Sequence, residues 1–279
     1  MPESDVCSRR RLGVHHMSHA ALNPLVRRFE TIISLSEDEK KAILNLPVRV
    51  ADLRADADIV REGDRPSQCC LLVEGFLCRY KYLSDGKRQI MAFYVPGDIP
   101  DLLSLHIDVM DHSLATIIPS KVAFIPHDAL GNLIDQNPRI GNAFWRDTLI
   151  DASTFREWIV SLGSRDAYSR IGHLICEMFL KLKAVGLTNG NSFNFPITQG
   201  EIGDATGLST VHVNRSIMEL RKEGLIILEK GRCTIPDLRR LEEAAKFDPT
   251  YLHLTGARRA GMGDSPGTDR ALRLDANCA

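Results

Sequence analysis

Residues 198–215 read TQGEIGDATGLSTVHVNR, from Thr198 to Arg215. Thr198 followed three residues later by Glu201 is a capping box, a pattern with which helices begin. Gly207 then suits a turn, and Ser209 is a typical N-cap for another helix. This segment therefore predicts a helix, a tight turn and a second helix.

The second helix of this pair is predicted over residues 210–223, because Gly224 suits a helix end. Val213, Ile217 and Leu220 recur every three or four positions and therefore form one buried stripe. Most other residues in the first half of the helix then face outwards, where they can contact another molecule.

A β-hairpin is expected directly after this helix. Apolar runs at 225–228 and 233–235 flank a Lys230-Gly231 turn, so residues 164–248 are predicted to form a winged helix-turn-helix. Such a helix fits the major groove of DNA, where Arg can recognise guanine, Asn can recognise adenine and Val can contact a thymine methyl group. The predicted base contacts are Thr210, Val211, Asn214 and Arg215, and the predicted phosphate contacts are Thr198, Ser209, His212, Lys222, Lys230 and Arg232.

The charge of this unit adds no independent support for DNA binding. Residues 164–248 hold 12 Lys or Arg against 11 Asp or Glu, which is weakly basic for a DNA-binding domain. A helical hairpin inside a larger fold is the alternative interpretation. The caps, the glycine turn, the exposed polar face and the following hairpin favour the winged helix.

A long helix is predicted before this unit, over residues 138–163. Its stripe of residues three or four positions apart can be buried only against another helix, although Asp151 in the middle departs from an apolar pattern. A second helix is expected over residues 164–185 and a loop over 186–195. We expect the stripe of the long helix to be a dimer interface, formed by Phe144, Thr148, Phe155, Trp158 and Leu162.

Short β-rich runs separated by turn residues fill the segment from Val48 to Ile125, which predicts a small sandwich or barrel. Residues 76–82 alternate, so one face of this strand is expected to point inwards and the other to meet water. Asp85-Gly86 predicts a hairpin turn with a positive φ at both residues.

Both ends of the chain are poor in apolar residues. Residues 1–22 are therefore expected to be flexible and residues 249–279 to be disordered. Deletion of residues 1–16 and 250–279 is expected to leave folding and DNA binding nearly unchanged. Met17 is an alternative candidate for the start of translation.

The composition of the whole chain excludes several classes. Its 279 residues are 44% hydrophobic and 25% charged, as in a globular protein, and the net charge is −1. No apolar run approaches the roughly 18 residues of a membrane span and no secretory signal is visible, so a cytoplasmic protein without a membrane partner is expected. The seven cysteines are irregularly spaced, which favours free thiols.

Six short motifs lie between Ile59 and Arg215: IVREGD (59–64), VEG (73–75), DGKRQI (85–90), PGD (96–98), ITQGEIG (197–203) and GLSTVHVNR (207–215). With their surroundings, from about Asn23 to Leu238, they resemble the family of the cAMP receptor protein and the fumarate–nitrate reduction regulator. The resemblance implies an α+β fold with an N-terminal cyclic-nucleotide-binding-type β-roll (jelly roll) over residues 23–137, a dimerisation helix over 138–163 and the winged helix-turn-helix. It also implies a homodimer on a palindromic promoter site, a base-contacting Arg215 and RNA polymerase as a partner.

The resemblance also shows where this chain departs from cAMP-binding members. Those members carry Gly-Glu-Leu, whose Glu takes the ribose hydroxyl, and later Arg-Ser, whose Arg takes the cyclic phosphate. This chain has Pro100-Asp101-Leu102 and His112-Ser113 instead. Proline has no N–H and histidine lacks the permanently charged guanidinium fork, so cAMP is not expected to bind. The candidate effector pocket consists of Asp98, Asp101, His112 and Ser113.

The cysteines and the polar residues of one loop are further candidates for a sensing role. The oxygen-sensing branch holds an iron–sulfur cluster on several N-terminal cysteines, whereas only Cys7 precedes the roll here, so neither this cluster nor any other cofactor or metal is predicted. The adjacent Cys69-Cys70 pair is either redox-active or a pair of buried strand thiols. A loop with polar side chains is either a metal or haem site or simply solvated: His106, Asp108, Asp111 and His112.

Two other classes of function fit the sequence less well than a DNA-binding regulator. An enzyme requires a nucleophile, a base and a stabilising group, and the sequence shows no G-x-S-x-G, H-E-x-x-H, phosphate-binding or dinucleotide motif. A cyclic-nucleotide-controlled kinase or channel subunit would keep the phosphate cassette and lack the winged helix, which is the reverse of what is seen. The chain is therefore expected to be a transcription regulator that responds to an unidentified effector or redox signal at the roll and acts as an activator or a repressor.

Overall fold

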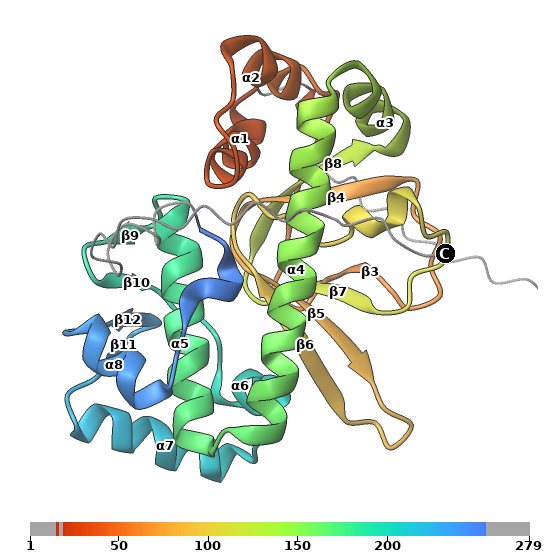
Figure 1. The fold of residues 1–279 in the computed structure, drawn as a ribbon. Helices are drawn as coiled ribbons and strands as arrows, with labels where there is room; N and C mark the ends of the chain where they lie inside the picture. The colour runs from red at the N-terminus through yellow and green to blue at the C-terminus, as the bar shows by residue number, and fades with distance from the viewer. Residues whose placement is uncertain (1–14, 17–18, 255–279) are drawn as a thin grey trace, which may run out of the picture.

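The computed structural model describes residues 15–16 and 19–254. Figure 1 shows a β-roll beside the long helix α4 (Pro138–Ser164), with a smaller domain at the lower left that contains the C-terminal helices. This is the predicted α+β architecture. The roll and the smaller domain lie along α4, so this helix connects the two.

Two four-stranded antiparallel sheets form the roll, in the orders β1-β2-β8-β4 and β3-β7-β5-β6. Their inner faces bury a core that includes Cys70, Leu72, Leu77, Leu114 and Val122. The strands are β1 (His15–His16), β2 (Arg49–Leu53), β3 (Asp58–Val60), β4 (Gln68–Glu74), β5 (Leu77–Tyr82), β6 (Arg88–Tyr94), β7 (Ser113–Thr116) and β8 (Ser120–Pro126).

The hairpin between β5 and β6 departs from two expectations. Gly86 has a positive φ of 81° but Asp85 does not, and the Leu83 N–H donates to the Lys87 carbonyl. The turn is therefore a three-residue loop closed by a left-handed glycine. In addition, Leu77, Cys78, Arg79 and Tyr80 are all buried, so neither face of this part of β5 meets water.

Short helices gather at one end of the roll, around the start of α4 (Figure 1). Phe29 and Phe144 pack edge to face there, with their ring centroids 4.7 Å apart. These helices are η1 (His19–Leu22), α1 (Asn23–Glu30), α2 (Glu37–Leu44) and α3 (His127–Gln136), and η2 (Leu102–Leu105) follows β6.

The expectation of a flexible segment over residues 1–22 is wrong for its described part. β1 pairs with β2, and Ala21 and Leu22 are buried in the same core as Leu25. The apolar Ala-Leu pair anchors η1 because it continues the buried face of α1. Residues 1–14 and 17–18 lie outside the described part of the chain.

The smaller domain begins with α5 (Ala167–Ala184), whose inner face is buried against α7 and α8. The expected loop at 186–195 contains two short strands that extend the wing to four strands in the order β11-β12-β10-β9. The remaining elements are β9 (Thr188–Asn189), β10 (Ser192–Asn194), α6 (Gln199–Thr206), α7 (Thr210–Lys222), β11 (Ile227–Glu229), β12 (Arg232–Thr234), α8 (Leu238–Ala245) and η3 (Pro249–Leu252).

The helix-turn-helix forms for the local reasons that its sequence indicates. The side chains of Thr198 and Glu201 close the capping box of α6, and Ser209 caps α7. Gly207 has a φ of 67°, and a Cβ on Gly203 would lie 2.7 Å from the Leu208 carbonyl oxygen. The two glycines therefore allow the turn and its close return past α6.

The expected disordered tail is partly wrong, because η3 packs against α4. Tyr251 and Leu252 are buried, and the Tyr251 hydroxyl donates to Glu177 at 2.7 Å. These two apolar side chains give the segment a face to bury, so deletion from residue 250 onwards would remove part of the core. Residues 255–279 lie outside the described residues.

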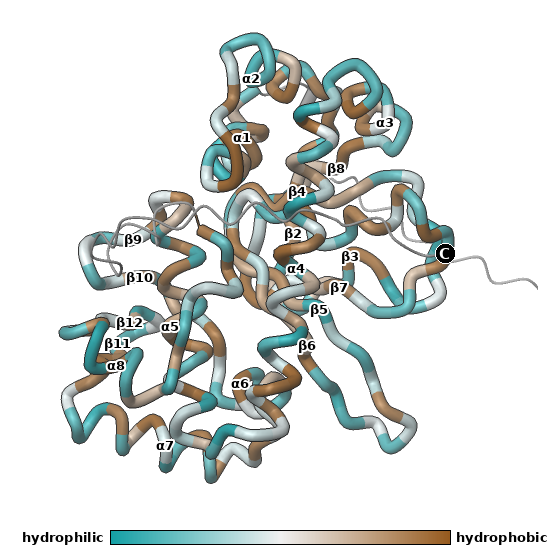
Figure 2. Tube along the Cα trace, in the orientation of Figure 1, coloured by the Kyte–Doolittle hydropathy of each residue, from teal (hydrophilic) through white to brown (hydrophobic). Residues whose placement is uncertain are grey.

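Hydropathy follows this arrangement (Figure 2). Hydrophobic residues concentrate in α5 and the strands of the roll, whereas α2 and the projecting tip of the β5–β6 hairpin are largely hydrophilic. No helix among residues 15–16 and 19–254 has both the length and the apolar character needed to cross a membrane.

Candidate nucleic-acid interface and sensor pocket

The outer face of α7 lies at the lower edge of the molecule in Figure 1, away from the roll. Thr210, Val211, Asn214 and Arg215 are all exposed, as expected for residues that contact another molecule. The stripe of Val213, Ile217 and Leu220 is buried, which fixes the rotation of the helix. The structure therefore brings the four predicted base contacts together on one open face.

A groove of about 380 Å³ lies between the start of α6 and the wing. Three of the predicted phosphate contacts line it: Thr198, Lys230 and Arg232. The Arg232 guanidinium is held at the wing by Ser192 at 3.3 Å and by Asn194 at 3.4 Å. The other three, Ser209, His212 and Lys222, are exposed on or next to α7 outside this groove.

Two further residues of this surface were not predicted from the sequence. Gln199 and Arg221 line the same groove, and the Asn214 side-chain amide donates to Gln199 at 3.4 Å. Gln199 is the first residue of α6, where helix N–H groups favour an anion, so its position was a usable signal. Arg221 could be placed only once the fold showed that the wing returns beside α7.

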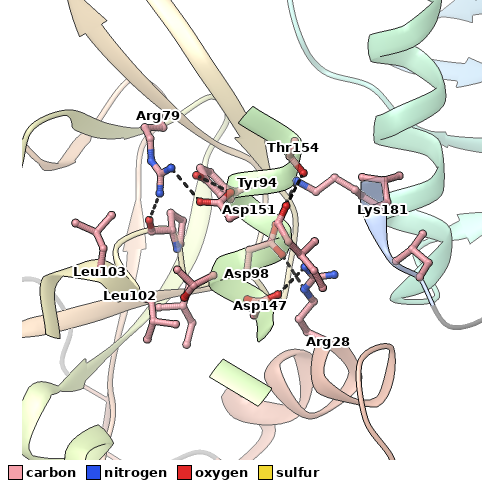
Figure 3. Close-up of a pocket in the computed structure, with 16 residues that line it drawn as sticks. Arg28, Arg79, Tyr94, Asp98, Leu102, Leu103, Asp147, Asp151, Thr154 and Lys181 are labelled. Atoms are coloured by element: carbon pink, nitrogen blue, oxygen red, sulfur yellow. Dashed lines mark hydrogen bonds and ion pairs between the residues drawn. The ribbon is translucent and has the colours of Figure 1, made fainter. Parts of the chain in front are cut away.

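A second candidate site lies where the roll, α1, α4, α5 and the end of η3 meet (Figure 3). It is a cavity of about 60 Å³, which is enough for a few water molecules. Its polar lining consists mainly of three basic and three acidic side chains, Arg28, Arg79, Lys181, Asp98, Asp147 and Asp151.

Arg79 joins the roll to α4. Its guanidinium donates to Asp151 at 3.0 Å and to the Pro100 carbonyl, and it lies over the rings of Tyr94 and Phe155 at 5.2 and 4.9 Å. The side chain is 5% exposed. Burial lowers the pKa of Arg79, but Tyr94 and the neighbouring carboxylates outweigh it, so the pKa is raised and the group stays charged.

Arg28 makes a second connection, from α1 to the same helix. It pairs with Asp147 at 2.7 Å and with Asp98 at 3.4 Å, and Asp98 also lies 3.7 Å from Lys181. Burial raises the pKa of Asp147, and Arg28 opposes that rise. All six charged groups of the cavity are therefore paired within the chain.

Of the four residues of the expected effector pocket, Asp98 lines this cavity and the other three do not. Asp101 is buried and accepts from the Cys70 N–H at 2.7 Å. The His112 ring bonds Asp111 at 2.6 Å, and the Ser113 hydroxyl accepts from the Glu62 N–H at 3.1 Å. These side chains stabilise loops of the roll, and the sequence missed Arg79 because it lies at a strand position that alternation assigns to water.

The redox interpretation of Cys69 and Cys70 finds no support in their surroundings. Both thiols are buried, and burial raises the pKa of each well above its usual range, which disfavours the reactive thiolate. Residues 15–16 and 19–254 contain no group of three or more His, Cys, Asp or Glu that could hold a metal ion, the loop from His106 to His112 included.

The predicted dimer stripe of α4 is largely wrong. Phe144 packs on Phe29, Phe155 covers Arg79, and the Trp158 indole donates to Glu177 at 3.0 Å. Of that stripe, Thr148 and Leu162 are exposed. The large apolar side chains that α4 leaves open are Trp145, Leu149, Ile159, Val160 and Leu162.

Comparison with known proteins supports the assignment of both the roll and the winged-helix domain. Residues 50–137 match the cyclic nucleotide-binding domain, and residues 169–244 match the Crp-like helix-turn-helix domain. The chain belongs to the Crp/Fnr family of transcription regulators. The match to the helix-turn-helix domain includes α6 and α7. The open face that carries the predicted DNA contacts therefore lies within the matched domain.

Relatives of this Crp/Fnr regulator align with it over most of both chains. It is 24% identical over 225 residues to the transcriptional activator protein FnrL of Cereibacter sphaeroides, covering 79% of this chain and 90% of that protein. It is 25% identical over 231 residues to the nitrogen fixation regulation protein FixK of Bradyrhizobium diazoefficiens, covering 81% and 94%. The structure of FixK2 from Bradyrhizobium japonicum superposes with a TM-score of 0.64 at 23% identity, covering 71% and 98%, which supports the fold.

Proposed function

We propose that this Crp/Fnr regulator binds a palindromic promoter site as a homodimer, with α7 of each subunit in the major groove. The observation that carries the proposal is the outer face of α7, where Asn214 and Arg215 are exposed beside Thr210 and Val211. An exposed Arg and Asn in the first half of such a helix can bond guanine and adenine edges.

The groove beside the wing complements this face. Lys230 and Arg232 are exposed there, next to the first turn of α6. Lysine and arginine on a wing neutralise phosphates without reading the sequence. We therefore assign base recognition to α7 and phosphate binding to the wing and the start of α6.

The second subunit is proposed to pack on the open apolar face of α4. Ile159 is 70% exposed and Trp145 is 66% exposed, which is unusual for side chains of this size on a 27-residue helix. With the two-fold axis parallel to this helix, the two copies of α7 would lie on the same side of the dimer.

The roll is proposed to act without a cyclic nucleotide. Arg79 places a buried guanidinium, paired with Asp151, between the roll and α4, and His112 lacks the guanidinium that cAMP-binding members use.

RNA polymerase is proposed as the protein partner at the promoter, in keeping with the activator names of relatives. Transcription regulators of this family are generally not enzymes, and we propose no catalytic activity here.

The experiment starts by selecting bound duplexes from a random library and then measures affinity for the selected and a scrambled duplex over a salt series. Arg215→Ala should cost about 1 to 3 kcal/mol per half-site on the selected duplex and much less on the scrambled one. Lys230→Gly should weaken both alike and lower the salt slope by about one phosphate. Glycine is chosen because Lys230 has a φ of 48°, which alanine would strain.

Arg239→Ala is the matched control, because Arg239 is an exposed arginine on α8 and does not line the groove beside the wing. It should behave as the wild type on both duplexes. Equal losses of affinity by Arg215→Ala on the selected and scrambled duplexes would reduce Arg215 to a phosphate contact, and the absence of any enriched duplex would refute the proposed function.

A further inference from the structure

The outer face of α7 carries an apolar side chain that charge and hydrogen bonding do not explain. Val211 is 75% exposed, the largest value among the large hydrophobic residues that the structure describes. The next two, Ile159 and Trp145, lie on the face of α4 that is proposed to meet a second subunit. Because those exposed apolar side chains are assigned to an interface, the still more exposed Val211 is also expected to contact another molecule.

Val211 belongs to a stripe on the open side of the recognition helix. Val211, Arg215 and Met218 are four and three residues apart, so they lie above one another on one face. Met218 is 52% exposed, and the inward positions are taken by Val213 and Ile217. Because the buried stripe fixes the rotation of α7, Val211 cannot turn into the core of its own chain.

The edges of base pairs in the major groove are polar with one exception. The C5-methyl group of thymine is the apolar feature there, and 5-methylcytosine presents a methyl group at the same place. Any other edge would lose water-mediated hydrogen bonds against a valine side chain without replacement. A valine next to Arg215 and Asn214 is therefore suited to a methylated pyrimidine.

We propose that Val211 reads the C5-methyl group of a pyrimidine in each half-site and is a specificity-determining residue. This inference rests on the proposed function. Val211 and Arg215 are one helical turn apart, a rise of about 6 Å, whereas base pairs are about 3.4 Å apart. The methylated pyrimidine therefore lies within about two base pairs of the guanine that Arg215 contacts.

The test replaces thymines of a selected duplex by deoxyuridine, one position at a time, which removes the methyl group and leaves base pairing intact. For wild-type protein, one thymine per half-site should be sensitive, with a loss of about fourfold for one half-site and about 15-fold for both, as for one buried methyl group. At that position, a 5-methylcytosine–guanine pair should bind about fourfold more tightly than a cytosine–guanine pair.

Val211→Ala should bind the thymine and uracil duplexes with nearly equal affinity. Met218→Ala, an exposed apolar control on the same face, should keep the wild-type difference. The inference is overturned if a selected duplex is bound but no uracil substitution matters, or if Val211→Ala retains the sensitivity. If no duplex is selected at all, the proposed function itself fails, and the inference falls with it.

Discussion

Helices α4 and α7 were both expected to meet other molecules, and they differ in how they do so. On α7 the residues expected to face outwards are exposed, and Val213 and Leu220 face the core as predicted. On α4 the aromatic residues Phe144 and Trp158, which were expected at a dimer interface, are buried against their own chain. The same periodicity argument thus succeeded for one helix and failed for the other.

The difference has a physical cause. α7 has one apolar stripe and otherwise polar residues, so burial of that stripe fixes its orientation. α4 is apolar on two sides, because it packs on the roll and α5 with one side and leaves Leu149 and Ile159 on the other. For such a helix, the spacing of the apolar residues identifies both apolar stripes. It does not show which stripe packs in the core of the same chain.

The largest expected effect tests this assignment of the two sides of α4. Leu149→Glu combined with Ile159→Glu should give a folded monomer, because charges would be buried at the proposed interface. Sedimentation gives the mass and circular dichroism the fold. Trp158→Glu is the comparison, and it should unfold the protein because Trp158 packs on Phe93 and bonds Glu177. A folded dimer of the double variant would place the interface elsewhere.

The inner side of α4 can be tested through its buried ion pair. Arg79→Ala removes the guanidinium that donates to Asp151 and to the Pro100 carbonyl, and Asp151 keeps only the longer bond from the Tyr94 hydroxyl at 3.4 Å. The free energy of unfolding should therefore fall by about 3 to 5 kcal/mol in a urea titration. The double variant Arg79→Met with Asp151→Leu replaces the pair by apolar groups and should recover most of this loss. Equal losses in both variants would show that packing, and not the unpaired charge, dominates.

The packing of η3 on α4 should have a slightly smaller effect. Leu252 is 3% exposed, so Leu252→Ala should lower the free energy of unfolding by about 3 kcal/mol. A chain that ends after Leu254 should keep the wild-type melting temperature, whereas one that ends after Asp248 should melt several degrees lower. Equal melting temperatures for the two truncations would restore the view that η3 is dispensable.

The smallest effect concerns pH. Burial raises the pKa of Asp101 to about 7, whereas the unfolded chain ionises an aspartate near pH 4. The native state therefore holds the proton more tightly, and this contribution to stability is present at low pH and is lost as the pH rises from about 4 to 7.

Asp101→Asn keeps an acceptor for the Cys70 N–H and removes this titration. Relative to the wild type, its free energy of unfolding should rise by about 2 kcal/mol between pH 5.5 and 8, measured by urea denaturation at each pH. A flat difference for Asp101→Asn would mean that this carboxyl ionises as an ordinary surface aspartate.

The sequence predicted those parts of the fold that local chemistry determines. The caps at Thr198 and Ser209 and the turn at Gly207 specify α6 and α7 almost to the residue, because each acts within a few positions. The helix predicted over 138–163 runs one residue further, to Ser164. The recognition helix was predicted one residue too long, since Lys222 ends it and Glu223 is its C-cap.

The cavity of paired charges between the roll and α4 could not be predicted in this way. Arg79, Arg28 and Asp147 come from three separate elements, and only the tertiary fold brings them together. Alternation assigned Arg79 to water because it describes a sheet with one solvated face, whereas α4 covers that face here. Ion pairs between residues far apart in the sequence produce no periodic pattern, so these pairs could not be predicted from the spacing of residues.

The position of η3 has a consequence for how the protein is made. Synthesis proceeds from the N-terminus, and the strands of the roll from β2 to β8 are complete at residue 126. Tyr251 and Leu252 reach their places between α4 and α5 only after the whole winged helix has been translated. A nascent chain therefore carries a finished sensor domain well before the segment that secures its DNA-binding domain has left the ribosome.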